Sequence, residues 1–241
     1  MRLDRYLVAL GEGSRTEVQD RIRRGQVCLQ GHVMTRPETE CGRNPEITLE
    51  GRRLDTRLIR HVMLHKPEHV LTAARDRKQK TVMDLLPGVY ASLGCMPVGR
   101  LDRDTTGLLL LTCDGELNHR LLSPRRHVDK VYEAEVEGTP GAEEIRRFGE
   151  GLFLGDFTAA PALLEILETG EHSLARVTIH EGKFHQVRRM FEAVGHPVRR
   201  LHRSAFGPLI LPEDLLPGTF RELTETEENA VYAAAGMERK Q

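Results

Sequence analysis

Apolar residues recur at helical spacing near the start of the chain. Leu3, Leu7 and Leu10 predict a first helix, which ends at Gly11. Residues 14–17 (SRTE) match a capping box, and the apolar residues that follow predict a second helix up to Gly25. Alternating residues 27–33 with a turn at 30–31 predict a hairpin, and 47–49 a further short strand. The first 58 residues therefore predict a small unit of two helices and a hairpin sheet.

Strand patterns dominate after residue 60. The charged stretch 52–60 carries few apolar residues and is interpreted as a linker. We expect strands at 62–64, 107–112, 131–136, 174–179 and 198–206, and short helices at 81–86, 117–122 and 186–194. This mixture predicts an α+β protein with two domains, at 1–58 and 61–241.

Composition excludes several classes of protein. With 39% hydrophobic and 29% charged residues in 241, the chain is typical of a globular protein rather than a disordered one. No apolar run approaches the ~18–20 residues of a membrane span, and the amino terminus lacks an apolar signal core. We therefore expect a cytoplasmic protein that does not bind membranes. The four cysteines form no CxxC pair, so we expect reduced thiols rather than a zinc site or a disulfide framework.

The net charge of −1 hides an uneven distribution along the chain. Residues 1–60 hold 12 basic against 9 acidic residues, and residues 180–203 hold 6 against 2. Residues 204–241 hold 3 basic against 7 acidic residues. Two basic regions suit a phosphate-binding face, although solvated surfaces often carry such runs. The arginine-rich helix near residues 15–24 fits either a helix offered to phosphates or a cap docked on the larger domain.

The segment 99–107 (GRLDRDTTG) holds the strongest candidate chemistry, because two carboxylates and two arginines precede a strongly apolar strand. Asp102 lies between Arg100 and Arg103, whose charges favour its ionised form. An anionic carboxylate can act as a nucleophile or stabilise positive charge at a sugar C1′. Loop ion pairs without catalytic consequence are the alternative. A metal site at Asp102 and Asp104 is disfavoured, because no suitably spaced ligand cluster accompanies them.

At these residues the chain resembles the RsuA-type pseudouridine synthases. Residues 99–102 (GRLD), 106–112 (TGLLLLT) and 114–115 (DG) resemble the catalytic motif of that family. Residues 123–127 (SPRRH) with 130–132 (KVY), and residues 181–191 (EGKFHQVRRMF), agree with two more of its motifs. The amino-terminal unit is similar to the S4-type RNA-binding module that the family carries. The resemblance covers essentially the whole chain, and it implies an S4-type domain followed by a mixed, mainly antiparallel-sheet catalytic domain.

The resemblance implies an isomerase that converts a uridine of ribosomal RNA to pseudouridine without a cofactor or a metal. Asp102 matches the catalytic aspartate, Tyr132 the tyrosine that packs on the target base, and Arg188 the basic residue that pairs with the aspartate. The reaction itself needs an anion at C1′, a flat partner for the detached uracil and a base that leaves its stack. We further expect RNA contacts from the basic residues of these motifs, namely Arg15, Arg23, Arg24, Arg100, Lys130, Lys183 and Arg189.

The substrate is expected to be 16S ribosomal RNA in a partly assembled small subunit, bound by a monomer. Residues 119–127 and 185–187 resemble the small-subunit enzyme more than its large-subunit relatives. A 23S synthase is the alternative within the same class, and a non-catalytic assembly protein is the alternative outside it. One departure is His65 before Lys66 and Pro67, where the family generally has asparagine.

Overall fold

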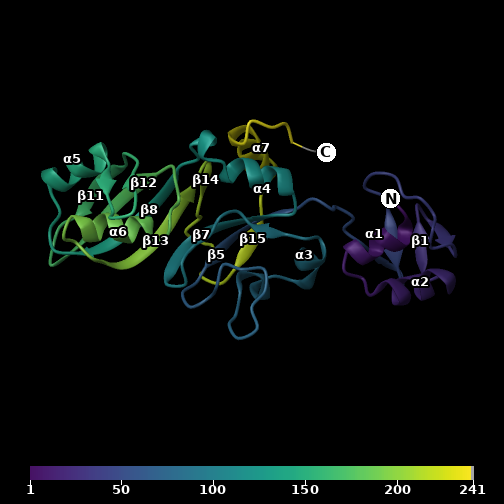
Figure 1. Ribbon diagram of the computed structural model, residues 1–241. Coiled ribbons are helices and arrows are strands. Elements are labelled where there is room, and N and C mark those ends of the chain that lie inside the picture. Colours follow the sequence, from purple (N-terminus) through teal and green to yellow (C-terminus); the bar gives the residue numbers. More distant parts are fainter. Residues whose placement is uncertain (240–241) are drawn as a thin grey trace. The chain divides into compact units, whose positions relative to one another are not determined.

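The computed structural model describes residues 1–239, which form two compact units (Figure 1). Unit 1 comprises Met1–Arg60 together with Leu86–Cys95, and unit 2 comprises His61–Leu85 together with the chain from Met96 onward. Among the described residues, no helix is long and apolar enough to span a membrane.

Unit 1 packs helices against a small sheet. Helix α1 (Leu3–Ala9) and helix α2 (Arg15–Arg23) contact each other, and α3 (Gly88–Ser92) contacts α1. The sheet has the order β2-β1-β3-β4, with β1 Val27–Leu29, β2 His32–Met34, β3 Ile47–Leu49 and β4 Arg52–Arg53. The capping box of α2 is confirmed, because the Ser14 hydroxyl and the Glu17 carboxylate each accept the other's backbone N–H. The predicted helices and hairpin are therefore present.

The linker expected over 52–60 is wrong at its start. Residues Arg52–Arg53 form β4, which pairs antiparallel with β3, and Leu54 is buried in the core of unit 1. Arg60 is also buried and donates a hydrogen bond to the Asp55 carbonyl. The pattern failed here because both strand residues are exposed arginines and leave no apolar alternation to detect.

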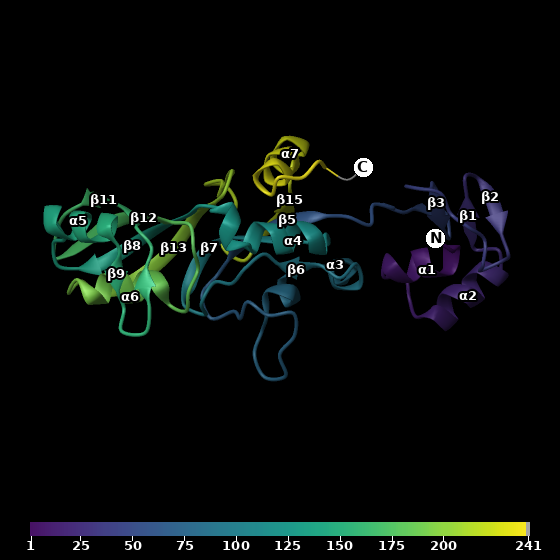
Figure 2. The same cartoon turned by 45° about the horizontal axis from the view of Figure 1, so that its top comes forward.

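Unit 2 is built on one mixed sheet with the order β11-β12-β8-β13-β7-β5-β15 (Figures 1 and 2). Its neighbouring strands pair antiparallel, except for β13 and β7, which are parallel. The short strands β6 and β14 pair with β7 and β13 outside this order. A mixed, mainly antiparallel α+β fold is therefore confirmed. The strand bounds are β5 His61–Lys66, β6 Met96–Pro97, β7 Thr105–Thr112, β8 Lys130–Glu137, β11 Leu163–Glu168, β12 His172–Ile179, β13 Val198–Phe206, β14 Leu209–Ile210 and β15 Phe220–Glu222.

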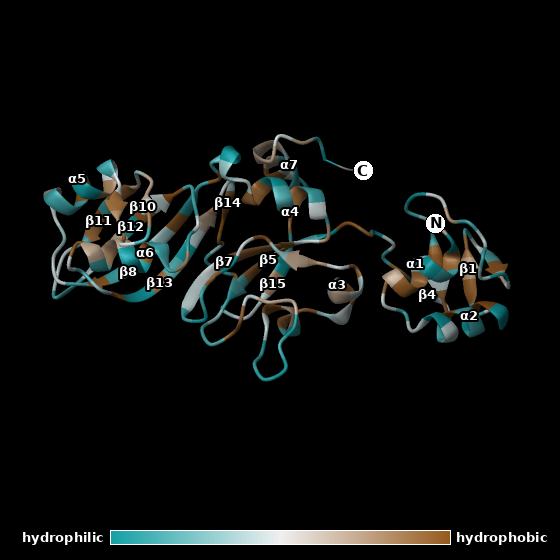
Figure 3. Ribbon diagram, in the orientation of Figure 1, coloured by the Kyte–Doolittle hydropathy of each residue, from teal (hydrophilic) through white to brown (hydrophobic). Residues whose placement is uncertain are grey.

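The helices of unit 2 flank this sheet. Helices α4 (Gly115–Leu122) and α7 (Glu225–Ala234) lie side by side in both ribbon views and share one core with β7. The Tyr232 hydroxyl of α7 donates to Asp114, which caps α4. Figure 3 shows brown, hydrophobic segments on strands of this unit, whereas its loops range from teal through white to brown. The remaining elements are η1 Val82–Leu85, η2 Pro124–Arg126, α5 Ala142–Glu150, β9 Leu152–Phe153, β10 Thr158–Ala159 and α6 Gln186–Ala193.

The cysteines differ from the sequence expectation. Cys28 and Cys41 are free thiols, whereas Cys95 and Cys113 are disulfide-bonded. The expectation of reduced thiols is wrong for the latter two, because spacing along the chain does not report which sulfur atoms meet in the fold.

Candidate active site

Asp102 lies in the loop that leads from β6 into β7. The strand is rigid, because Leu108, Leu109, Leu110 and Leu111 are completely buried. The loop is fixed as well: the Thr72 hydroxyl donates to the Leu101 carbonyl (2.7 Å) and accepts from the Leu101 N–H. A half-exposed carboxylate therefore stands on an immobile support, as a reactive group requires.

Lys66 holds the same loop from inside the protein. Its buried Nζ donates to three carbonyls, those of Pro67 (3.0 Å), Arg103 (3.2 Å) and Thr105 (2.9 Å). Burial lowers the pKa of Lys66 to about 8, against the opposing pull of nearby aspartates. Sequence analysis noted Lys66 only beside the departure at His65. The structure places it as the anchor of the backbone around Asp102.

A pocket of about 710 Å³ opens beside Asp102. This volume lies within the range of ligand-binding pockets in proteins. Its walls come from the Asp102 loop, from β8, from β13 and from the turn between β12 and α6. Five residues singled out in the sequence line it together, namely Arg100, Asp102, Lys130, Tyr132 and Lys183.

Tyr132 reaches the pocket from β8, the strand on which residues 132, 134 and 136 are buried in alternation. It pairs across the sheet with Arg203 of β13, which in turn pairs with Gly107 of β7. A Cβ on Gly107 would lie 2.3 Å from the Arg203 carbonyl oxygen, and Gly107 has a φ of +108°. Only glycine therefore allows β13 to approach β7 this closely, next to the Asp102 loop.

The basic residues of α6 face other partners than the Asp102 carboxylate. Arg188 donates to the carbonyls of Val198 (3.1 Å) and Asp104 (3.4 Å) and does not line the pocket. Arg189 binds Asp156 and lies over the Phe157 ring. The Asp102 carboxylate instead contacts His185, whose Nε2 is 3.6 Å from Oδ1.

Two further polar residues of the pocket were missed by the sequence analysis. Arg203 and Thr105 are each only 1% exposed. The Nε of Arg203 donates to the Leu108 carbonyl (2.8 Å), while its Nη2 and the Thr105 hydroxyl find no hydrogen-bond partner in the described part of the chain. Strand alternation could have indicated the burial of Arg203, because Arg203 lies two residues after Leu201 and therefore on the same buried face of the strand.

Lys130 adds a second, half-buried cation to the same wall. Its Nζ donates to the Val128 carbonyl (2.8 Å) and lies 5.7 Å from the centre of the Phe206 ring, over which Arg203 also lies. Burial, and then the charge of Arg203, lowers the pKa of Lys130 to about 8. The pocket thus brings together Asp102, the Tyr132 ring and two cations, of which Arg203 is buried and Lys130 is half-buried. In the described residues, no group of three or more His, Cys, Asp or Glu side chains is placed to hold a metal ion.

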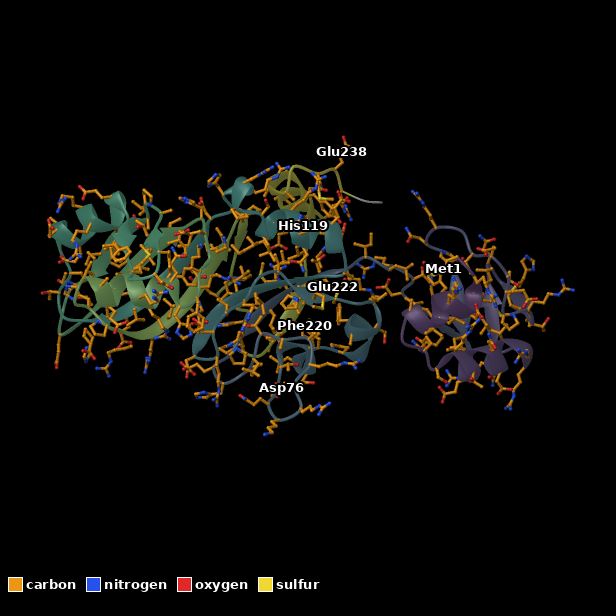
Figure 4. The ribbon with its side chains drawn as sticks, in the orientation of Figure 1. Met1, Asp76, His119, Phe220, Glu222 and Glu238 are labelled. Atoms are coloured by element: carbon orange, nitrogen blue, oxygen red, sulfur yellow. The ribbon has the colours of Figure 1, made fainter. Side chains whose placement is uncertain are left out.

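An exposed loop that the sequence analysis missed projects from the protein near the Asp102 loop. Residues 74–80 between β5 and η1 are exposed, and Asp76 lies at the tip of the projecting loop (Figure 4). The Asp76 carboxylate accepts the N–H groups of Lys78 and Gln79, both at 2.8 Å, which orders the tip. The base of the loop is joined to the Asp102 loop, since the His69 N–H donates to the Arg103 carbonyl. The basic residues that the loop carries are Arg75, Arg77, Lys78 and Lys80.

Comparison with known families decides what this architecture is. The RNA pseudouridylate synthase family model matches residues 60–193, and the S4 domain model matches residues 1–47. The chain belongs to the RNA pseudouridine synthases. It is an isomerase of the RsuA-like group, with an amino-terminal S4 domain and a pseudouridine synthase domain.

Relatives of this pseudouridine synthase carry names for both ribosomal subunits. The chain is 37% identical to ribosomal large subunit pseudouridine synthase B of Bacillus subtilis, covering 97% of this chain and 96% of the relative. It is also 37% identical to ribosomal small subunit pseudouridine synthase A of Vibrio cholerae, covering 96% of this chain and all of the relative. A crystal structure of a pseudouridylate synthase superposes with a TM-score of 0.66 at 32% identity, over 96% of this chain and 99% of the other.

Proposed function

We propose that this enzyme isomerises one uridine of 16S ribosomal RNA, with Asp102 as the nucleophile. The observation that carries the assignment is the position of Asp102, because its carboxylate is half-exposed in a pocket that Tyr132 also lines. A uridine can present its ribose to the carboxylate only after its base leaves the RNA stack. The pocket then supplies a place for the base, and Tyr132 a flat surface against it.

The proposed reaction balances within one nucleotide. A carboxylate oxygen of Asp102 bonds to C1′ as the N1–C1′ bond breaks, and the bonding electron pair leaves with uracil. The uracil turns until C5 faces C1′. The C5–C1′ bond then forms, Asp102 is released, C5 loses its proton and N1 gains one. Lys130 and Arg203 place positive charge beside the pocket while uracil is negatively charged, and Tyr132 is the group we propose for the proton step at C5.

The choice of 16S RNA rests on sequence motifs. Residues 119–127 (HRLLSPRRH) and 185–187 (HQV) resemble the small-subunit enzyme, and one relative at 37% identity carries the small-subunit name. A relative of equal identity carries the large-subunit name, so 23S RNA is the second candidate substrate. We assign the RNA contacts outside the pocket to Arg15 and Arg23 of α2 and to its C-cap residue, Arg24.

Mapping of pseudouridine in 16S and 23S RNA tests this proposal. Each RNA, both free and in partly assembled subunits, is incubated with the wild-type enzyme, with Asp102→Asn and with Asp104→Asn. Asp104 is the matched control, since it lies in the same loop and its side chain is exposed to solvent. We expect one new site in 16S RNA with the wild type and with Asp104→Asn, and none with Asp102→Asn.

The other outcomes separate the alternatives. A site in 23S RNA would keep the chemistry and overturn the substrate. Modification by Asp102→Asn would reject the nucleophile. Binding without modification by the wild type, in every RNA, would indicate a protein that assists ribosome assembly without catalysis.

A further inference from the structure

An aromatic pair stands exposed at the rim of the pocket. Phe184 is 75% exposed although it lines the pocket, and its ring stacks on that of His185 with centroids 3.9 Å apart and planes inclined by 16°. A single exposed apolar side chain needs no explanation by itself. Here the ring is fixed by stacking, and one of its faces stays open to solvent beside a site that acts on RNA.

The turn that carries Phe184 is rigid. Buried Gln186 accepts the Lys183 N–H (3.0 Å) through Oε1 and donates through Nε2 to Glu181 (2.6 Å). His185 adopts the left-handed backbone conformation, with φ 50° and ψ 29°, which is uncommon for a residue other than glycine. Such a conformation persists where the surroundings enforce it, often at functional sites. The Phe184 ring is therefore presented in one position and loses little freedom on binding a ligand.

His185 connects Phe184 to the proposed reaction centre. His185 contacts both residues: its ring stacks on that of Phe184, and its Nε2 lies 3.6 Å from the Asp102 carboxylate. If Asp102 receives the ribose of the target uridine, as proposed above, a neighbouring nucleotide comes within reach of the Phe184 ring. Lys183 adds an exposed positive charge at the same turn, which suits the adjoining phosphate.

We propose that Phe184 is a stacking platform for an unpaired base that flanks the target uridine. Proteins bind single-stranded RNA by stacking unpaired bases on aromatic side chains, because every base has a π face. This contact holds the strand in register while the target base occupies the pocket. It makes Phe184 a positioning residue, with no part in bond making.

A binding cycle between protein and RNA tests the platform. The protein variants are Phe184→Leu, Phe184→Tyr and, as the matched control, Phe153→Leu. Phe153 is 68% exposed in the same unit and does not line this pocket. The RNA is a fragment of ribosomal RNA that the wild type binds, with an abasic residue in place of the base on either side of the target uridine. Kd is measured for each pair at one salt concentration, together with the single-turnover rate.

We expect Phe184→Leu to weaken binding of the intact RNA roughly 5- to 100-fold, in line with the loss of one stacked base. Phe184→Tyr and Phe153→Leu should bind as the wild type does. One of the two abasic RNAs should weaken wild-type binding to the same extent and cause no further loss with Phe184→Leu. At saturating RNA, the rate should change less than Kd.

Two results would overturn the platform. One is that Phe184→Leu binds RNA as tightly as Phe153→Leu does. The other is that, for both abasic RNAs, the affinity loss caused by the missing base adds to the loss caused by Phe184→Leu. In the latter case Phe184 would contact something other than a flanking base, such as another protein. Failure of the proposed chemistry is distinguishable, because modification by Asp102→Asn rejects the nucleophile and leaves the binding cycle intact.

Discussion

At Gly107 two strand backbones approach so closely that no side chain fits between them. The atoms nearest to an added methyl group would belong to the Arg203 backbone, which cannot move aside as a flexible side chain can. The glycine in the motif at 106–112 is therefore a requirement of packing, whereas the role that we propose for Asp102 in the adjoining loop is chemical.

Replacement of Gly107 by alanine should destabilise unit 2. The methyl group meets the Arg203 carbonyl at 2.3 Å, and the φ of +108° is unfavourable for alanine. We expect the free energy of unfolding to fall by roughly 2–4 kcal/mol. Gly115→Ala is the control, because nothing lies within 4 Å of its added Cβ and Gly115 begins helix α4. Denaturant unfolding of both variants measures the difference, and equal stability would contradict the close approach.

His61 makes the stability of unit 2 depend on pH. Burial lowers its pKa to about 4, and its Nδ1 lies 2.8 Å from the Thr112 hydroxyl. Between pH 4 and 6.5 the unfolded chain binds more protons than the native one, so stability falls as the pH decreases through this range. A shift of this size removes about 2 kcal/mol between pH 7 and pH 5.

Urea unfolding at pH 7 and pH 5 measures this loss. His61→Asn should show a smaller difference between the two pH values than the wild type, because the titrating group is gone. His119→Asn, at an exposed position, should keep the wild-type difference. If His61→Asn loses as much stability as the wild type does, another group causes the acid sensitivity.

At the scale of elements, the sequence predicted those helices and strands that are specified by a few neighbouring residues. The capping box at Ser14 and the alternation through Tyr132 each specify an element within a few residues, and both are present. The parallel pairing of β13 with β7 joins residues about 95 positions apart, and no local pattern encodes it. Strand β4 was missed because its arginines carry no alternation. The buried position of Arg203 depends on that same long-range pairing.

The candidate site likewise has residues that the sequence indicated and contacts that only the fold creates. The motif containing Asp102, and the strand containing Tyr132, were visible in sequence, and the structure brings both to one pocket. The contacts of Lys66 with three carbonyls were not visible, because a lysine in a strand normally faces solvent. The same holds for the contact between His185 and Asp102, which requires the left-handed turn before α6.

The loop 74–80 should contribute to RNA affinity as an element. Four of its residues are basic and exposed, its tip is ordered by Asp76, and its stem is bonded to the Asp102 loop. Filter binding over a salt series measures both the affinity and the slope of log K against log salt. An unchanged slope would exclude the loop from the interface. The variant tested replaces Arg75, Arg77, Lys78 and Lys80 by glutamine. Its affinity for RNA should be weaker than that of the wild type, and its salt slope should be smaller by about 1 for each phosphate that is no longer bound.

At the scale of the whole molecule, the acidic carboxyl-terminal region is balanced by its own partners. Glu227 pairs with Arg221 at 2.6 Å, and hydrogen bonds from Arg221 lower the pKa of Glu227 to about 2. Arg239 likewise pairs with Glu225 and Glu228. The acidic excess of residues 204–241 is therefore partly used in holding α7, and it does not oppose the basic regions that we assign to RNA.

The S4 domain should contribute affinity through α2. Arg15 and Arg23 of α2 and its C-cap residue Arg24 are exposed, and a capping box fixes the start of this helix. Arg24 pairs with Asp20 one turn away, and the Arg15 Nε lies 4.0 Å from the Asp4 carboxylate, whereas Arg23 has no ion pair among residues 1–239. Replacing the three arginines by glutamine in the full chain should weaken RNA binding and lower the salt slope by up to about 3, with little effect on the single-turnover rate at saturating RNA.

A second triple variant, Arg52→Gln with Arg53→Gln and Arg57→Gln, supplies the control. It removes the same charge from unit 1. All three of its side chains are ion-paired, with Glu12, Glu46 and Asp55 respectively, whereas Arg23 in the first variant has no such pair in the described part of the chain. Charges neutralised within the protein attract phosphates less, so the control should lose less affinity. Equal losses would mean that only the net charge of unit 1 attracts RNA. A loss confined to the α2 variant would place the phosphate contacts on that helix.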